Sequence, residues 1–396
     1  MMKNKSIKKV TFIGFFTGML LLLSGCWDRI EMNDLAIVTA TGIDKTDDGQ
    51  VELSLEIFIP KSFGGSTLGG SGGGGGASGD TTMVASHKGR NFADALSKLQ
   101  TELPRKVFWG SCKIFIFGEE AAKEGIQEHL DFLARHRQTR EKAFVMVSEG
   151  KAKSLLDVKS TLERYSAETL REVSSRDRGT GVTLQDLDEM LVNKYQSAFL
   201  PYVTITADED KITPKHVVLN GTAILKEDRM IGVISESANR GILWLNGKLK
   251  DHTVTFQPDG EKGKISIFLV NIDINKKPLI EDGEWKMRLD IQAEGAIYQN
   301  STSMTVNDPK AEKKVKEAFK SKIQSHIQKS LEETQELKAD IAGYGKEFHR
   351  KHPQEWTRVK ENWQEMFPEI KTEFKIDAHI QWPGLIQEPI KGSGAQ

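Results

Sequence analysis

The sequence contains very little cysteine: only Cys26 and Cys112 occur in its 396 residues. A framework of several disulfide bonds is therefore excluded, and an exported form of the chain must owe its stability to packed cores. Cys112 lies in residues 109–117, whose apolar pattern predicts a strand, so we expect a buried and inert thiol. No histidine stands near it in sequence to support a nucleophile, although the fold could bring one close.

The chain also lacks a large excess of either charge. Its formal net charge is −1, and removal of the four lysines near the amino terminus would make it about −5. A nucleic-acid-binding protein would need a clearly basic face, so no nucleic-acid partner is predicted. Hydrophobic residues make up 38% and charged residues 28% of the chain, which is ordinary for a soluble protein with a packed core.

Catalytic and cofactor-binding motifs are missing as well. The sequence has no GxSxG and no HExxH motif. Residues 64–79 contain ten glycines, but they lack both the Lys-Ser/Thr pair of a P-loop and GxGxxG spacing. Their composition instead predicts a flexible surface loop inserted between two strands. We therefore predict that the chain is not an enzyme and uses no cofactor.

Residues 1–25 have the form of a cleaved leader. Lysines precede an apolar segment at residues 10–23, which is of secretory length and shorter than the roughly 20 residues of a membrane span. The following Leu23-Ser24-Gly25-Cys26 resembles the lipobox of bacterial lipoproteins, whose cysteine is acylated after the leader is removed. This similarity implies that Cys26 starts the mature chain and carries diacylglycerol and N-acyl groups. An ordinary signal peptide that happens to contain a cysteine is the alternative.

About 370 residues remain after the leader, which suggests two or three domains of about 100–200 residues each. Residues 35–43 and 51–59 predict a β-hairpin, and Asn91 is expected to cap a helix at residues 92–103. The pattern continues with strands at 113–117 and 143–147, a helix at 119–134 and a largely helical stretch at 151–200. Because strands and helices alternate, residues 26–206 are predicted to form a mixed α/β domain.

Short strands dominate residues 216–300, which follow a charged linker at residues 207–214. A turn is expected at Asn220-Gly221, and the predicted strands lie at 216–219, 222–225, 230–234, 243–245, 253–256, 264–274 and 285–293. This regular spacing is typical of a mostly β unit, so we predict a middle domain there.

Residues 301–385 combine a long helix with a final strand. Asp308-Pro309 is predicted to open a helix that runs to about residue 340 and ends before Gly343 and Gly345. Its apolar stripe is expected to face the core, and comprises Val315, Phe319, Ile323, Ile327 and Leu331. A second helix at 353–367 and a strand at 374–380 should follow. The predicted fold class is α+β, with three consecutive mixed domains.

Two pairs of side chains have a functional alternative to a structural role. His349 and His352 could share a metal ion on a helix, but no third ligand is evident, so a structural or solvated turn is preferred. Trp356 and Trp363 lie seven residues apart on one side of a helix. For these two, packing in the core is preferred over an exposed interface.

A basic run, Arg135-His136-Arg137 with Arg140, lies near the predicted end of a helix. It most simply compensates the helix dipole while remaining solvated. Contact with anionic lipid headgroups or with a partner protein is the alternative.

Three stretches of the chain together resemble the Ger(x)C family, the C-subunit lipoproteins of spore germinant receptors. They are Cys26-Trp-Asp-Arg-Ile-Glu-Met-Asn-Asp-Leu-Ala-Ile-Val-Thr-Ala-Thr-Gly-Ile-Asp44, Gly221-Thr-Ala-Ile-Leu225 with Ile231-Gly232, and Gly343-Tyr-Gly-Lys-Glu-Phe-His-Arg-Lys-His-Pro353 with Trp356 and Trp363. They occur in the family's order over nearly all of the mature chain. The glycine run at 64–79 is longer than the family leads us to expect, and Trp382-Pro383 replaces a more polar pair, which puts the strand register there in doubt.

The resemblance implies an elongated body anchored through Cys26 to the inner spore membrane, on its outer, non-cytoplasmic face. It also implies an A and a B membrane subunit as partners in a receptor that responds to nutrients and starts germination. A lipoprotein that itself binds a small nutrient is the alternative function, and an envelope hydrolase would need a catalytic set that the sequence does not contain.

Overall fold

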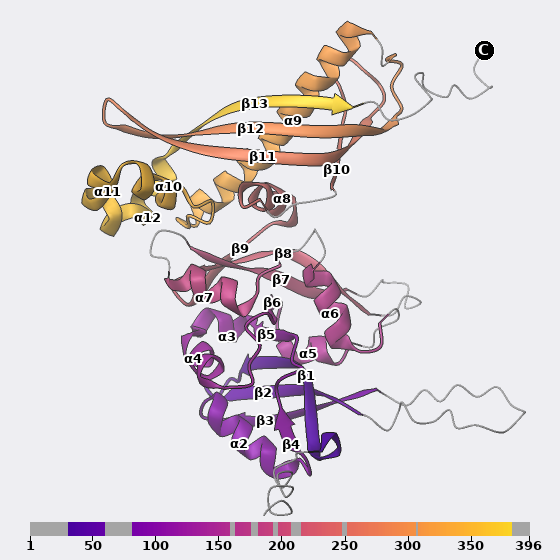
Figure 1. Cartoon of the computed structure of the whole chain (residues 1–396), viewed down its shortest axis with the longest axis vertical. Coiled ribbons are helices and arrows are strands. Elements are labelled where there is room, and N and C mark those ends of the chain that lie inside the picture. Colours follow the sequence, from indigo (N-terminus) through magenta and orange to yellow (C-terminus); the bar gives the residue numbers. More distant parts are fainter. Residues whose placement is uncertain are drawn as a thin grey trace, which may run out of the picture.

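The computed structural model describes residues 31–59, 81–158, 163–175, 181–192, 197–206, 215–247, 252–305 and 308–381. The predicted leader, Cys26, the glycine-rich loop at 64–79, the linker at 207–214 and the uncertain register after Gln381 lie outside these residues. The described part is elongated and contains two sheets, one toward each end of the long axis (Figure 1). The predicted α+β class is confirmed.

The first sheet has the strand order β3-β2-β1-β5-β6-β7-β8-β9, and β4 lies beside the start of β1. The central pairs are parallel: β1 pairs with both β4 and β5, β5 with β6, and β6 with β7. The outer pairs are antiparallel: β1 with β2, β2 with β3, β7 with β8, and β8 with β9. The bounds are β1 (Leu35–Lys45), β2 (Val51–Phe58), β3 (Thr82–Gly89), β4 (Lys106–Phe108), β5 (Ile114–Gly118), β6 (Phe144–Ser148), β7 (Ala198–Thr206), β8 (His216–Lys226) and β9 (Arg229–Ile234). The predicted β1–β2 hairpin is confirmed.

Helices cover both faces of this sheet. Phe92, Leu99 and Leu133 pack in the core under α2 and α4, while Leu155 and Leu170 of α5 and α6 pack in a separate core on the opposite face. The helices are α2 (Phe92–Glu102), α3 (Glu119–Glu124), α4 (Gln127–Arg135), α5 (Ala152–Leu156), α6 (Ser166–Ser175) and α7 (Leu184–Val192), and a short 3₁₀ turn, η1 (Met32–Asp34), precedes β1.

Local signals correctly placed α2 but not all of its neighbours. Asn91 caps α2 as predicted, because its Oδ1 accepts the N–H of Asp94 at 2.9 Å. The single helix expected at 119–134 is wrong: Gly125, with φ of 134°, separates α3 from α4. Asp228 stabilises this break, since its carbonyl accepts the N–H of Ile126 at 3.0 Å.

Two buried carboxylates from the hairpin cap helices far along the chain. Glu56 accepts the N–H groups of Ser166 at 3.1 Å and Ala167 at 3.2 Å at the start of α6, while Asp44 accepts that of Ala152 at 2.7 Å at the start of α5. Burial raises the pKa of both carboxyl groups, and these hydrogen bonds oppose the shift. The caps therefore tie the helices on one face to the hairpin.

The second sheet has the order β10-β11-β12-β13, with β13 parallel to β12 and the others antiparallel. Its strands are β10 (His252–Phe256), β11 (Ile265–Glu281), β12 (Glu284–Asn300) and β13 (Lys371–Gln381), and its helices are α8 (Glu236–Leu245), α9 (Pro309–Glu336), α10 (Tyr344–Lys351), α11 (Pro353–Val359) and α12 (Trp363–Met366). The five residues of the apolar stripe of α9 are each at most 1% exposed and pack with the sheet; they are Val315, Phe319, Ile323, Ile327 and Leu331. The prediction that this stripe faces the core is confirmed.

Four expectations for residues 216–385 are wrong. Residues 243–245 are the end of helix α8, not a strand, and this helix packs against α9 and β8. The short apolar run at 242–245 does not by itself distinguish a buried helix end from a strand. Asn220-Gly221 is not a turn but lies within β8, where Gly221 adopts φ of 121°. Helix α9 ends at Glu336, short of 340, and Gly343 and Gly345 do not end it, because Gly343 is the N-cap of α10 and Gly345 lies within α10. The 3₁₀ turns at Lys360–Asn362 and Phe367–Glu369 (η3 and η4) interrupt the helix expected at 353–367.

The stretch 151–200 is also less helical than predicted. Its last residues start β7, which pairs with both β6 and β8, so β8 and β9 belong to the same hydrogen-bonded sheet as β6 and β7. In the second sheet, β13 completes the layer that β10 to β12 begin. The division into domains at 26–206, 216–300 and 301–385 stays a prediction.

Asp340 lies at the junction between the two sheets. Its side chain is buried, and its oxygens accept the N–H of Tyr344 at 2.9 Å, the N–H of Gly345 at 2.6 Å and the indole Nε1–H of Trp363 at 3.0 Å. Its backbone carbonyl accepts the N–H of Ser197, immediately before β7, at 3.0 Å. Asp340 therefore holds the start of α10 and α12 with its side chain and the first sheet with its backbone.

The chain around Asp340 contributes to both cores. Ala339 and Ile341 pack in the core of the first sheet, whereas Ala342 and Tyr344 pack in the core of the second. Lys276 of β11 donates a hydrogen bond to the carbonyl of Ala342. Burial raises the pKa of Asp340, while its three N–H donors and the nearby Lys276 lower it. The two sheets are thus joined by a packed and hydrogen-bonded segment.

We predict that Asp340→Ala destabilises the protein by about 3 to 5 kcal/mol, because three buried N–H donors lose their acceptor. Urea unfolding followed by tryptophan fluorescence would measure this loss. Asp377→Ala, an exposed residue of β13, is the matched control and should change stability by no more than about 0.5 kcal/mol. Equal midpoints for the two variants would show that Asp340 does not hold the junction.

Candidate functional site

The predicted lipidation site, Cys26, lies outside the described residues, so its acylation stays a prediction. The described chain resumes at Glu31 and enters η1 and β1 within four residues. Within the described ranges, no helix combines the length and the apolar composition of a membrane span.

Cys112 is fully buried, as predicted. Its Sγ lies 3.6 Å from Thr41 Oγ1 and donates to the carbonyl of Ile114 at 3.4 Å. Burial raises the pKa of its thiol to about 12, so the reactive thiolate is not formed near neutral pH. The side chain is therefore part of the core.

The histidine and tryptophan pairs both lie in the α10–α12 region. His352 Nε2 lies 3.2 Å from the carbonyl of Pro278, whereas the ring of His349 lies 6.2 Å from that of Trp356, so the two imidazoles contact different elements. In the part of the chain that the structure describes, no three His, Cys, Asp or Glu side chains form a group that could hold a metal ion. Trp356 and Trp363 are 1% and 4% exposed, and their rings meet edge to face at 4.8 Å. Their prediction as core residues is confirmed.

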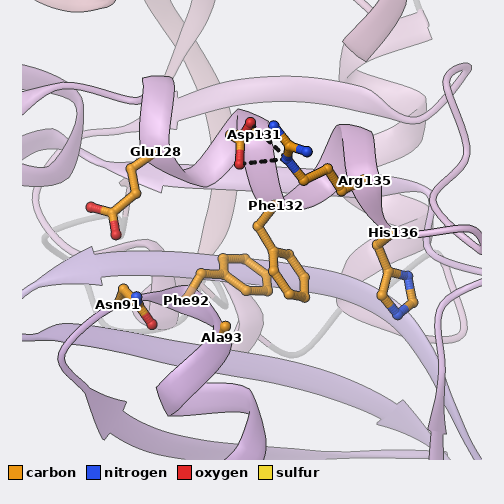
Figure 2. Close-up of a pocket in the computed structure, with 8 residues that line it drawn as sticks. All are labelled: Asn91, Phe92, Ala93, Glu128, Asp131, Phe132, Arg135 and His136. Atoms are coloured by element: carbon orange, nitrogen blue, oxygen red, sulfur yellow. Dashed lines mark hydrogen bonds and ion pairs between the residues drawn. The ribbon is translucent and has the colours of Figure 1, made fainter.

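A surface hollow of about 280 Å³ lies between the start of α2 and the outer side of α4 (Figure 2). The rings of Phe92 and Phe132 stack at 4.3 Å between their centroids, and His136 stacks on Phe132 at 5.6 Å. The remaining lining residues are Asn91, Ala93, Glu128, Asp131 and Arg135. The hollow therefore combines aromatic rings with side chains of both charges.

The charges around the hollow are arranged along α4. Arg135 donates to both carboxylate oxygens of Asp131 at 2.9 Å, and this interaction lowers the pKa of Asp131. Burial lowers the pKa of His136, so its imidazole is mainly neutral near neutral pH. Such a site could hold a small zwitterion against an aromatic surface, but it offers no activated nucleophile. The sequence did not indicate it, because its residues come from helices about 40 positions apart.

The basic run divides at the end of α4. Arg135 is the last residue of the helix, as the dipole argument predicted, and is paired with Asp131. Arg137 and Arg140 are exposed and form no ion pair with another described residue. Contact of these two with lipid or a partner stays a prediction.

Two family models match the chain in succession. The model described as spore germination protein N-terminal domain matches residues 28–205, and the model described as spore germination B3/GerAC like, C-terminal, matches residues 220–384. Together they span most of the chain, including both sheets. The order of these two matches is the order that the sequence resemblance implied.

Individual relatives match over nearly their full length. The chain is 27% identical to the putative spore germination protein YfkR of Bacillus subtilis (strain 168), over 93% of this chain and 96% of the relative. It is 25% identical to spore germination protein KC of the same organism, over 94% and 95% of the two chains. The crystal structure of the GerBC protein matches with a TM-score of 0.56 and 18% identity, over 86% of this chain and 96% of that one, and so shares its fold. By its two family models, its relatives and its fold, the chain belongs to the Ger(x)C family of spore germination proteins.

Proposed function

We propose that this chain is the membrane-anchored C subunit of a nutrient germinant receptor, needed for assembly and signalling that starts spore germination. The observation that carries the proposal is the succession of the two spore germination models over residues 28–205 and 220–384. Relatives named spore germination proteins B3 and A3, at 22% identity, support it. In this proposal an A and a B membrane subunit are the partners, and the chain itself performs no catalysis.

Anchoring through an acylated Cys26 would give the body a defined orientation. Eight residues separate Cys26 from Leu35, and the nine steps along the chain can span at most about 30 Å. The start of β1, with β4 beside it, would therefore lie near the outer face of the inner spore membrane. The second sheet lies at the other end of the molecule (Figure 1) and would extend away from the lipid. Surfaces of both sheets would then be available to partner subunits at different heights.

Spores that lack this chain should lose their response to one class of nutrient while a non-nutrient trigger still germinates them. Optical-density loss of purified spores measures both responses. Complementation with the wild-type gene should restore the nutrient response, whereas Cys26→Ala should not, because an unacylated chain keeps its leader.

Mass spectrometry of the Cys26→Ala chain checks the processing step directly. A processed and lipid-labelled variant would contradict the anchoring proposal. Spores that lack both this chain and the other germinant receptors of the same organism should not respond to nutrients. Unchanged nutrient responses in those spores would contradict the receptor proposal.

A second candidate function, direct binding of a small nutrient, is favoured by the hollow between α2 and α4. An amino acid would meet the cation of Arg135, the carboxylates of Glu128 and Asp131, and the stacked ring of Phe132. The carboxylate of the amino acid would face the cation, its ammonium group would face the carboxylates, and its side chain would lie against the ring.

Calorimetry with a panel of amino acids on the chain without leader and lipid tests this candidate. Binding at the hollow should be saturable, and Phe132→Ala should weaken it by about fivefold or more, since a lost aromatic contact costs about 1 kcal/mol or more. Arg137→Ala, an exposed residue outside the hollow, is the control. Absence of heat with every amino acid would leave only the assembly role.

A further inference from the structure

The helices α8 and α9 are in close contact between the two sheets. A Cβ atom at Gly241 would lie 2.1 Å from Ser330 Oγ and 2.6 Å from the carbonyl oxygen of His326, so only glycine permits this approach. At one end of α8, Ser235 Oγ donates to Glu333 at 2.7 Å. The helices therefore run antiparallel, with residues 235–244 of α8 beside residues 333–326 of α9.

This packing brings cationic side chains together along one edge of the helix pair. Lys329 of α9 donates to Ser237 of α8 at 2.6 Å, and the ring of His326 stacks on Trp244 at 5.6 Å. Arg240 lies between Ser237 and Trp244 on α8, and Lys322 lies one turn from His326 on α9. We call Arg240, Lys322, His326 and Lys329 the cationic edge.

Two cations of the cationic edge have no ion-pair partner within the described chain. No carboxylate of the described residues forms an ion pair with Arg240 or Lys322. Lys329 is paired with Glu333, whose carboxylate lies 4.0 Å away and also accepts the N–H of Ser235 before α8. Burial, then Lys322 and Arg240, then His252 and Lys329, lower the pKa of His326 to about 4. The named charges that act on this imidazole are thus all of one sign.

The spacing of the cations indicates the shape of an anionic partner. Lys322 and Lys329 are seven residues apart on one helix, which separates them by about 10 Å along its axis. One phosphate group cannot contact both, whereas carboxylates along an acidic peptide can. Helix α8, which carries Arg240, lies between the sheets and away from the start of β1 (Figure 1). A membrane surface is therefore the poorer match.

We propose that the cationic edge binds an acidic segment, rich in Asp or Glu, of a partner protein in the receptor. The proposal rests on the proposed function, in which other subunits surround this chain. Arg240 and Lys322 supply the unpaired charges, and the close contact at Gly241 fixes the distance between the two helices that present them. Binding would relieve the repulsion among Arg240, Lys322 and Lys329.

The test uses hexaglutamate as the probe, added to the complete chain without leader and lipid, with the histidine NMR signals as readout. The His326 signal is assigned by its loss in His326→Gln. Hexaglutamate should shift this signal and raise the pKa of His326, because added anions favour the imidazolium. Arg240→Gln and Lys322→Gln should each weaken binding by about threefold to fivefold, and salt near 1 M should abolish it.

Lys313→Gln is the matched control, since Lys313 is an exposed residue of the same helix on its opposite side. It should leave hexaglutamate affinity unchanged. Each of three results would overturn the proposal. The first is a shift of the His326 signal with inorganic phosphate but not with hexaglutamate, and the second is no shift at all. The third is equal weakening of hexaglutamate binding by Arg240→Gln, Lys322→Gln and the control Lys313→Gln. The measurement involves neither spores nor lipid, so its failure is distinct from failure of the receptor proposal.

Discussion

The architecture depends on one buried carboxylate, that of Asp340, and on the N–H groups that converge on it. A charged group in a dry interior is stable only when its oxygens are hydrogen-bonded, and three donors satisfy this requirement. Two of them, Tyr344 and Gly345, belong to the Gly-Tyr-Gly sequence by which the family is recognised. This part of the stretch that carries the family resemblance therefore has a structural role.

This junction has a consequence for how the protein could work. Residues 339–344 contribute apolar side chains to the cores of both sheets, and α8 packs against α9 between them. The two sheets are consequently connected by more than a tether. In a receptor, such a body can hold a partner at a fixed distance from the membrane, which suits a subunit whose task is assembly.

The sequence allowed prediction where the determining signals are local. The β1–β2 hairpin, the Asn91 cap and the apolar stripe of α9 were all predicted, because each depends on residues that are near one another in the sequence. Helix α8 was missed because its apolar residues gather in the short run 242–245, which taken alone resembles a buried strand. The caps by Glu56 and Asp44, and the hollow between α2 and α4, join residues that are distant in the chain. No local pattern marks such pairs, and they became visible only with the fold.

The account's central claim is that this chain works as a subunit among membrane partners, and co-purification tests it most directly. A tagged chain would be isolated from detergent-solubilised spore membranes, and the proteins bound to it identified by mass spectrometry. The account predicts that an A-type and a B-type receptor subunit accompany the wild-type chain in constant ratio. Recovery of the chain from the membrane without either subunit would contradict it.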